Sequence, residues 1–110
     1  MTSVKFLADK KSLYGFEISG HSSADCDDYE GKLVCAAVSS AAYMAANTVT
    51  EIIGDSAEAR VDEAKMLFKV SSPSAASIKV LEGLRLHLNE LSQQYSNNIK
   101  IHGGAKHVKD

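Results

Sequence analysis

Hydrophobic and polar residues alternate along four short stretches of the chain. The first two stretches are residues 4–8 and 14–19, and the other two are residues 57–61 and 66–70. Alternation with a period of two is typical of strands that bury one face. Within each pair the stretches are joined by a short turn-like run, which favours a hairpin. The pattern therefore predicts two β-hairpins.

Apolar residues recur at spacings of three and four in two longer segments, as in amphipathic helices. The first helix is predicted over residues 33–53, with Gly54 as its C-cap. The second is predicted over residues 73–96, with Ser72 as its N-cap and a proline at its first position. The apolar stripes are Val34, Val38, Ala41, Ala45, Val49 and Ile52 on the first helix, and Ile78, Leu81, Leu84, Leu88, Leu91 and Tyr95 on the second.

Ile99 and Ile101 indicate a short closing strand, which completes the order ββαββαβ. Two amphipathic helices and a mostly antiparallel sheet must each bury one apolar face, and the simplest solution is to pack them against each other. The predicted fold class is therefore α+β, a two-layer sandwich of a mostly antiparallel sheet with two long helices. At 110 residues we expect one domain, 1–110, with residues 103–110 as a loose polar tail.

Charge and composition narrow the function. The net charge is −2 and the basic residues do not cluster, so we expect no direct nucleic-acid binding. No window approaches about 18 consecutive apolar residues, and the first eleven residues lack an apolar signal core, so no membrane span and a cytoplasmic location are expected. In that compartment Cys26 and Cys35 are expected to be reduced thiols rather than a disulfide.

Cys35 is the first candidate for chemistry. It falls in the first turn of the predicted helix, where unpaired amide groups and the helix dipole favour a thiolate and can receive an oxyanion. His21 follows the glycine that ends the second strand, so a loop can bring its imidazole to the thiol as a base. Ser39 lies one helical turn beyond Cys35. The alternative stays open, because buried free cysteines are common in cores and most single histidines are not catalysts.

An acidic loop, residues 22–31, separates His21 from Cys35. A calcium loop would need glycine and glutamate where this chain has Glu30 and Ala36, so that pattern fails. A zinc site from His21, Cys26, Cys35 and one aspartate is conceivable, but the paired spacings of zinc sites are missing. We therefore expect no metal and no cofactor. The loop's carboxylates are either simply solvated or attract a basic substrate; they are Asp25, Asp27, Asp28 and Glu30.

The Gly-His pair at a strand end, the variable loop and then Leu-Val-Cys-Ala-Ala-Val-Ser opening an alanine-rich helix resemble the ribosomal-processing cysteine protease family, Prp. The later hairpin, leucine-striped helix and closing strand are also similar to that family. The resemblance implies a small cytoplasmic bacterial peptidase, dimeric, that removes an N-terminal extension from ribosomal protein L twenty-seven during large-subunit assembly. It further implies that Cys35 is the nucleophile, that His21 is the general base and that Ser39 lies close to the site.

The chain departs from the family pattern at Lys32, where many members have an aspartate three residues before the cysteine. The orienting carboxylate then has two other candidates, Asp27 and Asp28.

Two further questions stay open in the sequence. The competing functional class is a non-catalytic dimeric binding module for a ribosomal or assembly partner, in which Cys35 is a core residue. A homodimer is expected mainly from the resemblance. The small residues Ala36, Ser40 and Ala46 offer a face for close helix approach, although such faces also pack inside monomers.

Overall fold

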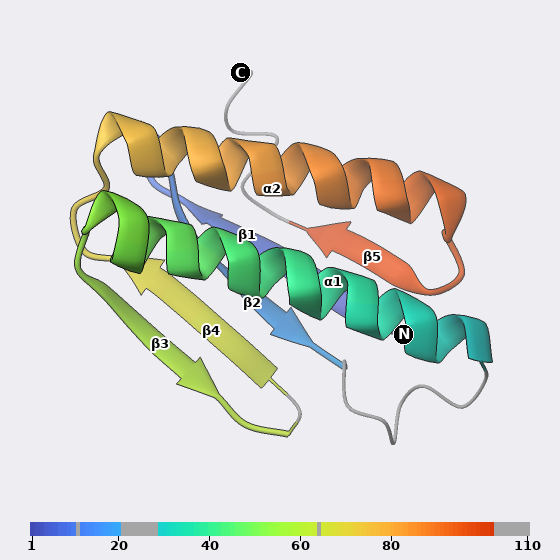
Figure 1. Cartoon of the computed structure of the whole chain (residues 1–110). Helices are drawn as coiled ribbons and strands as arrows, with labels where there is room; N and C mark the ends of the chain where they lie inside the picture. Colours follow the sequence, from blue (N-terminus) through green and yellow to red (C-terminus); the bar gives the residue numbers. More distant parts are fainter. Residues whose placement is uncertain (11, 21–28, 64, 103–110) are drawn as a thin grey trace.

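The structure describes residues 1–10, 12–20, 29–63 and 65–102. In this computed structural model two long helices lie side by side over one face of a single sheet (Figure 1). The α+β sandwich and its predicted order ββαββαβ are confirmed. The elements are β1 (Thr2–Ala8), β2 (Leu13–Ser19), α1 (Tyr29–Asn47), the π-helical segment η2 (Thr48–Ile53), β3 (Ala57–Val61), β4 (Lys65–Val70), α2 (Ala75–Gln94) and β5 (Ile99–His102).

The sheet has the strand order β3-β4-β2-β1-β5. Both predicted hairpins form, β1 with β2 and β3 with β4, and β2 pairs with β4 to join them into one antiparallel sheet. β5 adds to the other edge and runs parallel to β1, with Thr2 opposite Ile99. This parallel pair ties the start of β1 to the strand that follows α2.

The core lies between the sheet and the two helices. Phe6, Phe16 and Phe68 face one another across β1, β2 and β4, with ring centroids 6.5 Å apart for the first pair and 5.4 Å for the second. All three rings are almost fully buried, and burial of such side chains is the main force that holds the layers together. From the helices the core takes Val34, Val38, Ala42, Ala45 and Val49 of α1, and Leu81, Leu84 and Leu88 of α2.

The first long helix begins earlier than predicted, whereas its predicted C-cap, Gly54, is confirmed. It begins at Tyr29, four residues earlier than predicted. Its last turns are π-helical, and Gly54 ends them in the left-handed conformation, φ 92°, as a glycine C-cap does. The wider i→i+5 turn shifts the side chains that follow. Ile52 is therefore 79% exposed rather than part of the buried stripe.

The start of α2 corrects a second prediction, because the N-cap is Ser74 and not Ser72. The Ser74 hydroxyl accepts a hydrogen bond from the Ser77 amide at 3.3 Å and donates one to Asp55 at 2.8 Å. The same oxygen of Asp55 accepts from the Ser74 amide at 2.9 Å and from the Ser77 hydroxyl at 2.6 Å. These bonds, with the Ser77 hydroxyl first, lower the pKa of Asp55 below its ordinary value of 3.8. We call these three residues the Asp55 cluster.

The helical stretch Tyr29–Ile53 is also long and apolar enough to cross a membrane by length and composition alone, with a mean hydropathy of 1.3 over its most apolar window. The prediction of no span, which counted only consecutive apolar residues, did not anticipate this. Here the helix covers the sheet and supplies part of the core (Figure 1). Core helices pass the same test, so the finding is weak evidence for a span.

Candidate active site

Cys35 lies on the buried face of α1, with its side chain 8% exposed. It is the seventh residue of the helix, so it belongs to the second turn and not to the first turn where it was predicted. The sequence Tyr29-Glu30-Gly31-Lys32 continues the helix towards the N-terminus, and this adds about one turn before the cysteine.

This position changes the source of activation expected at Cys35. Unpaired amide groups belong to the first turn of a helix, and the dipole effect falls off within that turn. The predicted use of helix-start amides to favour a thiolate, or to hold an oxyanion, therefore does not fit the sulfur's place in α1. A group that activates Cys35 would therefore have to belong to another element.

The sulfur of Cys35 is disulfide-bonded in this structure. The prediction of a reduced thiol is wrong for this state of the chain. That prediction used only the redox compartment, whereas a disulfide also depends on whether the fold brings two cysteines within bonding distance. The other cysteine in the sequence, Cys26, lies outside the described residues.

A threonine hydroxyl lies against the same sulfur. The Oγ1 of Thr2, at the start of β1, is 3.3 Å from the Sγ of Cys35. Thr2 is 1% exposed, and its amide donates to the carbonyl of Asn98 at 2.8 Å. A disulfide sulfur carries no proton, so here the Thr2 hydroxyl is the donor. This contact joins β1 to α1 at the predicted nucleophile.

The end of β2 reaches the same corner of the molecule. Gly20 follows this strand with φ 73°, and a side chain there would collide with the carbonyl oxygen of Met1. Only glycine fits both the positive φ and this close approach. The chain position just before His21 therefore lies beside residues 1 and 2, and Thr2 contacts Cys35. His21 itself lies outside the described residues, as do Asp25, Asp27 and Asp28.

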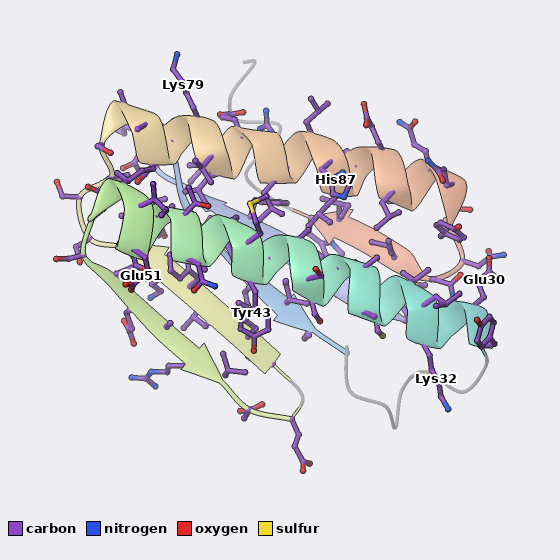
Figure 2. All side chains as sticks on the ribbon, in the orientation of Figure 1. Glu30, Lys32, Tyr43, Glu51, Lys79 and His87 are labelled. Carbon is purple, nitrogen blue, oxygen red and sulfur yellow. The ribbon has the colours of Figure 1, made fainter. Side chains whose placement is uncertain are left out.

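Three other site candidates lie on α1. Ser39 is half-buried and one turn beyond Cys35, as predicted. Glu30 was assigned to the acidic loop, but it lies in the first turn of the helix, where a carboxylate suits the dipole. Lys32, which replaces the family's aspartate, is exposed and extends from α1 on the side away from α2 (Figure 2). Among the described residues, no group of three or more histidine, cysteine or acidic side chains is placed to hold a metal ion.

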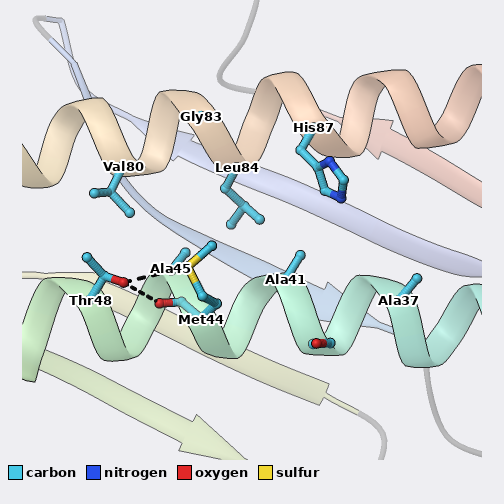
Figure 3. Close-up of a pocket in the computed structure, with 10 residues that line it drawn as sticks. Ala37, Ala41, Met44, Ala45, Thr48, Val80, Gly83, Leu84 and His87 are labelled. Atoms are coloured by element: carbon cyan, nitrogen blue, oxygen red, sulfur yellow. Dashed lines mark hydrogen bonds between the residues drawn. The ribbon is translucent and has the colours of Figure 1, made fainter.

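A groove of about 690 Å³ runs between the outer sides of α1 and α2 (Figure 3). Its lining is mainly apolar, from Ala37, Ala41 and Met44 on α1 and Leu84 on α2, and the His87 imidazole projects into it. Cys35 does not line this groove. The groove is therefore distinct from the contact between Cys35 and Thr2.

Thr2 is the residue at this site that sequence reasoning missed. The strand was predicted from Val4, although Thr2 continues the same alternation with Val4 and Phe6 on the buried face of β1. Extending the pattern by one more step would have placed Thr2 against the helices. Nothing in the sequence would have paired it with Cys35, which is 33 positions away.

Solved structures share this fold. The SMU.848 protein of Streptococcus mutans aligns with a TM-score of 0.83 at 20% identity, over 94% of this chain and 99% of that one. The ribosomal processing protease Prp of Staphylococcus aureus, in complex with a substrate peptide, aligns with a TM-score of 0.85 at 17% identity, over 94% and 100%. The same protease with a covalently linked product peptide aligns with a TM-score of 0.78 at 16% identity, again over 94% of this chain and 100% of that one. At these identities the likeness shows the fold alone.

Comparison by sequence identifies the family. No curated protein matches the chain. The family described as cysteine protease Prp matches residues 1–100, which is nearly the whole chain. This match favours the peptidase over the non-catalytic binding module. The chain belongs to the family of the cysteine protease Prp and is therefore a cysteine protease.

Proposed function

We propose that Cys35 is the nucleophile of this protease and that His21 is its general base. The observation that carries this proposal is the meeting of three chain segments at one corner. The glycine before His21 lies beside residues 1 and 2, and Thr2 contacts the sulfur of Cys35. Gly20 is the last described residue before His21, so the described chain approaches the proposed base at this corner.

The proposed reaction starts from the reduced protein. The imidazole of His21 takes the thiol proton, and the thiolate of Cys35 attacks the peptide carbonyl carbon. The imidazolium then gives its proton to the leaving amine, and a thioester remains on Cys35. Water, deprotonated by the same imidazole, hydrolyses the thioester and restores the thiol. Ser39, one turn along α1, is a candidate to support the site, and Asp27 and Asp28 are candidates to orient the imidazole.

The proposed substrate is the N-terminal extension of ribosomal protein L twenty-seven, cut during large-subunit assembly in the cytoplasm. The similarity to the ribosomal processing protease of Staphylococcus aureus, which was solved with a substrate peptide, supports a peptide of this kind. Ribosomal proteins are rich in basic residues, and the carboxylates predicted from the sequence to attract a basic substrate, Asp25 and Glu30 among them, suit such a segment. Direct nucleic-acid binding and membrane association are not part of this function.

Peptide cleavage tests the proposal directly. Reduced protein is incubated with a peptide that spans an apolar, aromatic-rich leader and the small residue after it, and products are followed by mass spectrometry. Cys35→Ala should lower the rate by at least about 1,000-fold, because the covalent step is lost. Cys26→Ser is the matched control and should keep the activity. Cleavage that persists in Cys35→Ala, or an intact peptide with reduced protein, would reject the assignment.

We further infer that two copies associate through the groove between α1 and α2. Met44 lines this groove and is 66% exposed, so an apolar projection and an apolar recess share one face. A two-fold axis would place Met44 of each copy in the groove of the other, which is the self-complementary contact of a symmetric dimer. The earlier candidate face of small residues is less suitable, because Ala46 is buried in the core.

Sedimentation can test this interface with neighbouring substitutions. Met44→Lys should give a monomer, because it places a charge in the apolar contact. Tyr43→Lys is the control, since Tyr43 is also exposed but projects towards β3 and β4, away from α2 (Figure 2). A dimer that survives Met44→Lys, or a wild-type protein that sediments as a monomer, would exclude this interface.

A further inference from the structure

Thr2 offers a defined hydroxyl to the sulfur of a buried cysteine, at 3.3 Å from Sγ of Cys35. Burial of Cys35 at 8% exposure disfavours the charged thiolate, because its solvation by water is lost. A hydrogen bond to the charged form acts in the opposite direction. The unpaired amides at the start of α1 cannot supply this hydrogen bond, because Cys35 lies in the second turn of the helix.

The backbone around Thr2 is held from both sides. β1 pairs with β2 on one side and with β5 on the other, and the Thr2 amide bonds to Asn98 at 2.8 Å. Threonine is branched at Cβ, so its χ1 angle is restricted. The hydroxyl therefore cannot easily turn away from the sulfur at 3.3 Å. Such restraint is what a positioning group needs, since its entropy is lost on folding and not during the reaction.

We propose that Thr2 is a positioning residue of this protease, whose hydroxyl orients the Cys35 sulfur and donates a hydrogen bond to the thiolate. The inference rests on the proposed role of Cys35. In the disulfide-bonded state the hydroxyl already donates to the sulfur. Because the Thr2 backbone is held by β5 and by the Asn98 carbonyl, we expect the same donor to face the thiolate after reduction. A hydrogen bond to an ionised acceptor is roughly twice as strong as one to a neutral acceptor, so the contact strengthens when the thiolate forms.

The other groups that titrate near this corner are placed differently. Among the described residues they lie at the chain start and on α1, β1 and β5, and each of them is exposed to solvent; they are the amino group of Met1, Glu30, Lys32, Lys5, Lys100 and His102. Water screens such charges, so their effect on a buried sulfur is small. His21 is the proposed base and also acts on the thiol, so the test must separate its effect from that of Thr2.

The experiment measures the pH dependence of Cys35 alkylation by iodoacetamide in a Cys26→Ser background, which leaves one thiol. Thr2→Val removes the hydroxyl while keeping the shape, and Thr2→Ala removes it with a smaller side chain. Both should raise the midpoint pH by about one unit and slow alkylation at pH 7 by roughly tenfold. Thr2→Ser keeps the hydroxyl and should stay near the wild-type midpoint. In all four proteins His21 is intact, so its contribution is constant.

A matched control is Thr50→Val, because the Thr50 hydroxyl donates to the carbonyl of Ala46 and not to the sulfur. It should leave the midpoint unchanged. In cleavage assays Thr2→Val should lower kcat and recover at higher pH, with KM nearly constant, since the hydroxyl acts on the nucleophile. An unmoved midpoint in folded Thr2→Val or Thr2→Ala, or an equal shift in Thr50→Val, would overturn the role of Thr2. Cleavage that still depends on Cys35 would then keep the proposed function intact.

Discussion

Two polar clusters are built into this small sandwich, and they use their hydrogen bonds differently. In the Asp55 cluster one carboxylate oxygen accepts three hydrogen bonds at 2.6 to 2.9 Å, from two serine hydroxyls and one amide. At Cys35 the Thr2 hydroxyl meets a sulfur at 3.3 Å, the looser distance of a weak acceptor. The first arrangement joins the turn that follows η2 to the start of α2. The second leaves the sulfur able to change its chemical state while the fold around it stays the same.

The difference suggests separate roles for the Asp55 cluster at the start of α2 and for Cys35 in the second turn of α1. A carboxylate with several donors holds its charge tightly, which is suited to stability. A cysteine sulfur can be protonated, ionised or oxidised, which is suited to chemistry. In the reduced protein, a conservative change at Cys35 should therefore alter activity more than stability, and changes in the Asp55 cluster should do the reverse.

The largest expected effect concerns the disulfide at Cys35. A disulfide sulfur cannot be deprotonated, so protein purified without reductant should cleave peptide at no more than about one-thousandth of the reduced rate. Added dithiothreitol should restore cleavage, and the rate can be followed by mass spectrometry.

The control for this effect is Cys26→Ser, because Cys26 is the chain's one other cysteine. This variant should cleave without any reductant. Equal activity of oxidised and reduced wild-type protein would show that the sulfur of Cys35 is not needed as a thiolate.

The second effect is on stability. Asp55→Asn removes the charge that three donors share, so the melting temperature should fall while cleavage by the folded, reduced protein is unchanged. The free energy of unfolding also gains a pH dependence from Asp55. Its folded-state pKa is below the ordinary 3.8, so its contribution is present above that pH and is lost as the pH falls through the folded-state value.

Thermal unfolding at several pH values checks both statements. The matched variant is Asp62→Asn, because Asp62 accepts an amide bond from Lys65 at 2.9 Å in the exposed turn between β3 and β4, where asparagine serves as well. It should change the melting temperature little. The difference in melting temperature between wild type and Asp55→Asn should become smaller at acidic pH. A difference that grew at acidic pH would contradict the lowered pKa of Asp55.

The smallest effect is the loss of the α2 N-cap. Ser74→Ala should lower the free energy of unfolding by about 1 kcal/mol, since the Ser77 amide loses its acceptor and Asp55 loses one donor. Ser92→Ala is the comparison, because the Ser92 hydroxyl only bonds to the carbonyl of Asn89 within the same helix. Urea unfolding measures both variants. Equal losses would mean that the cap contributes nothing specific.

Periodicity in the sequence predicted the elements and their layers. A strand or helix that buries one face has apolar residues at the regular spacing of that face, and this spacing can be read from the sequence. Element ends were less predictable. The early start of α1 at Tyr29 depends on residues with no apolar pattern, and the π-helical turn displaced Ile52 from the core. Ser72 and Ser74 both lie just before α2, and both have the hydroxyl that an N-cap needs. Ser74 is the one that bonds to Asp55, which is distant in sequence.

The candidate site was predictable only in part. Cys35 and Ser39 lie one turn apart on α1, as the spacing predicted. The contact of Thr2 with Cys35 is made by tertiary packing of β1 beneath α1, and local sequence carries no signal for it. The redox state of the sulfur also depends on the fold and not on composition.

The bond at Cys35 also affects how the protein withstands oxidants such as peroxide. A reactive thiolate that meets peroxide becomes a sulfenic acid and can continue to sulfinic and sulfonic acids, which ordinary thiols do not reduce. A sulfur already joined to another sulfur is kept from that route, and thiol exchange can release it later. The disulfide-bonded state is therefore one from which the proposed nucleophile, Cys35, would be recovered undamaged.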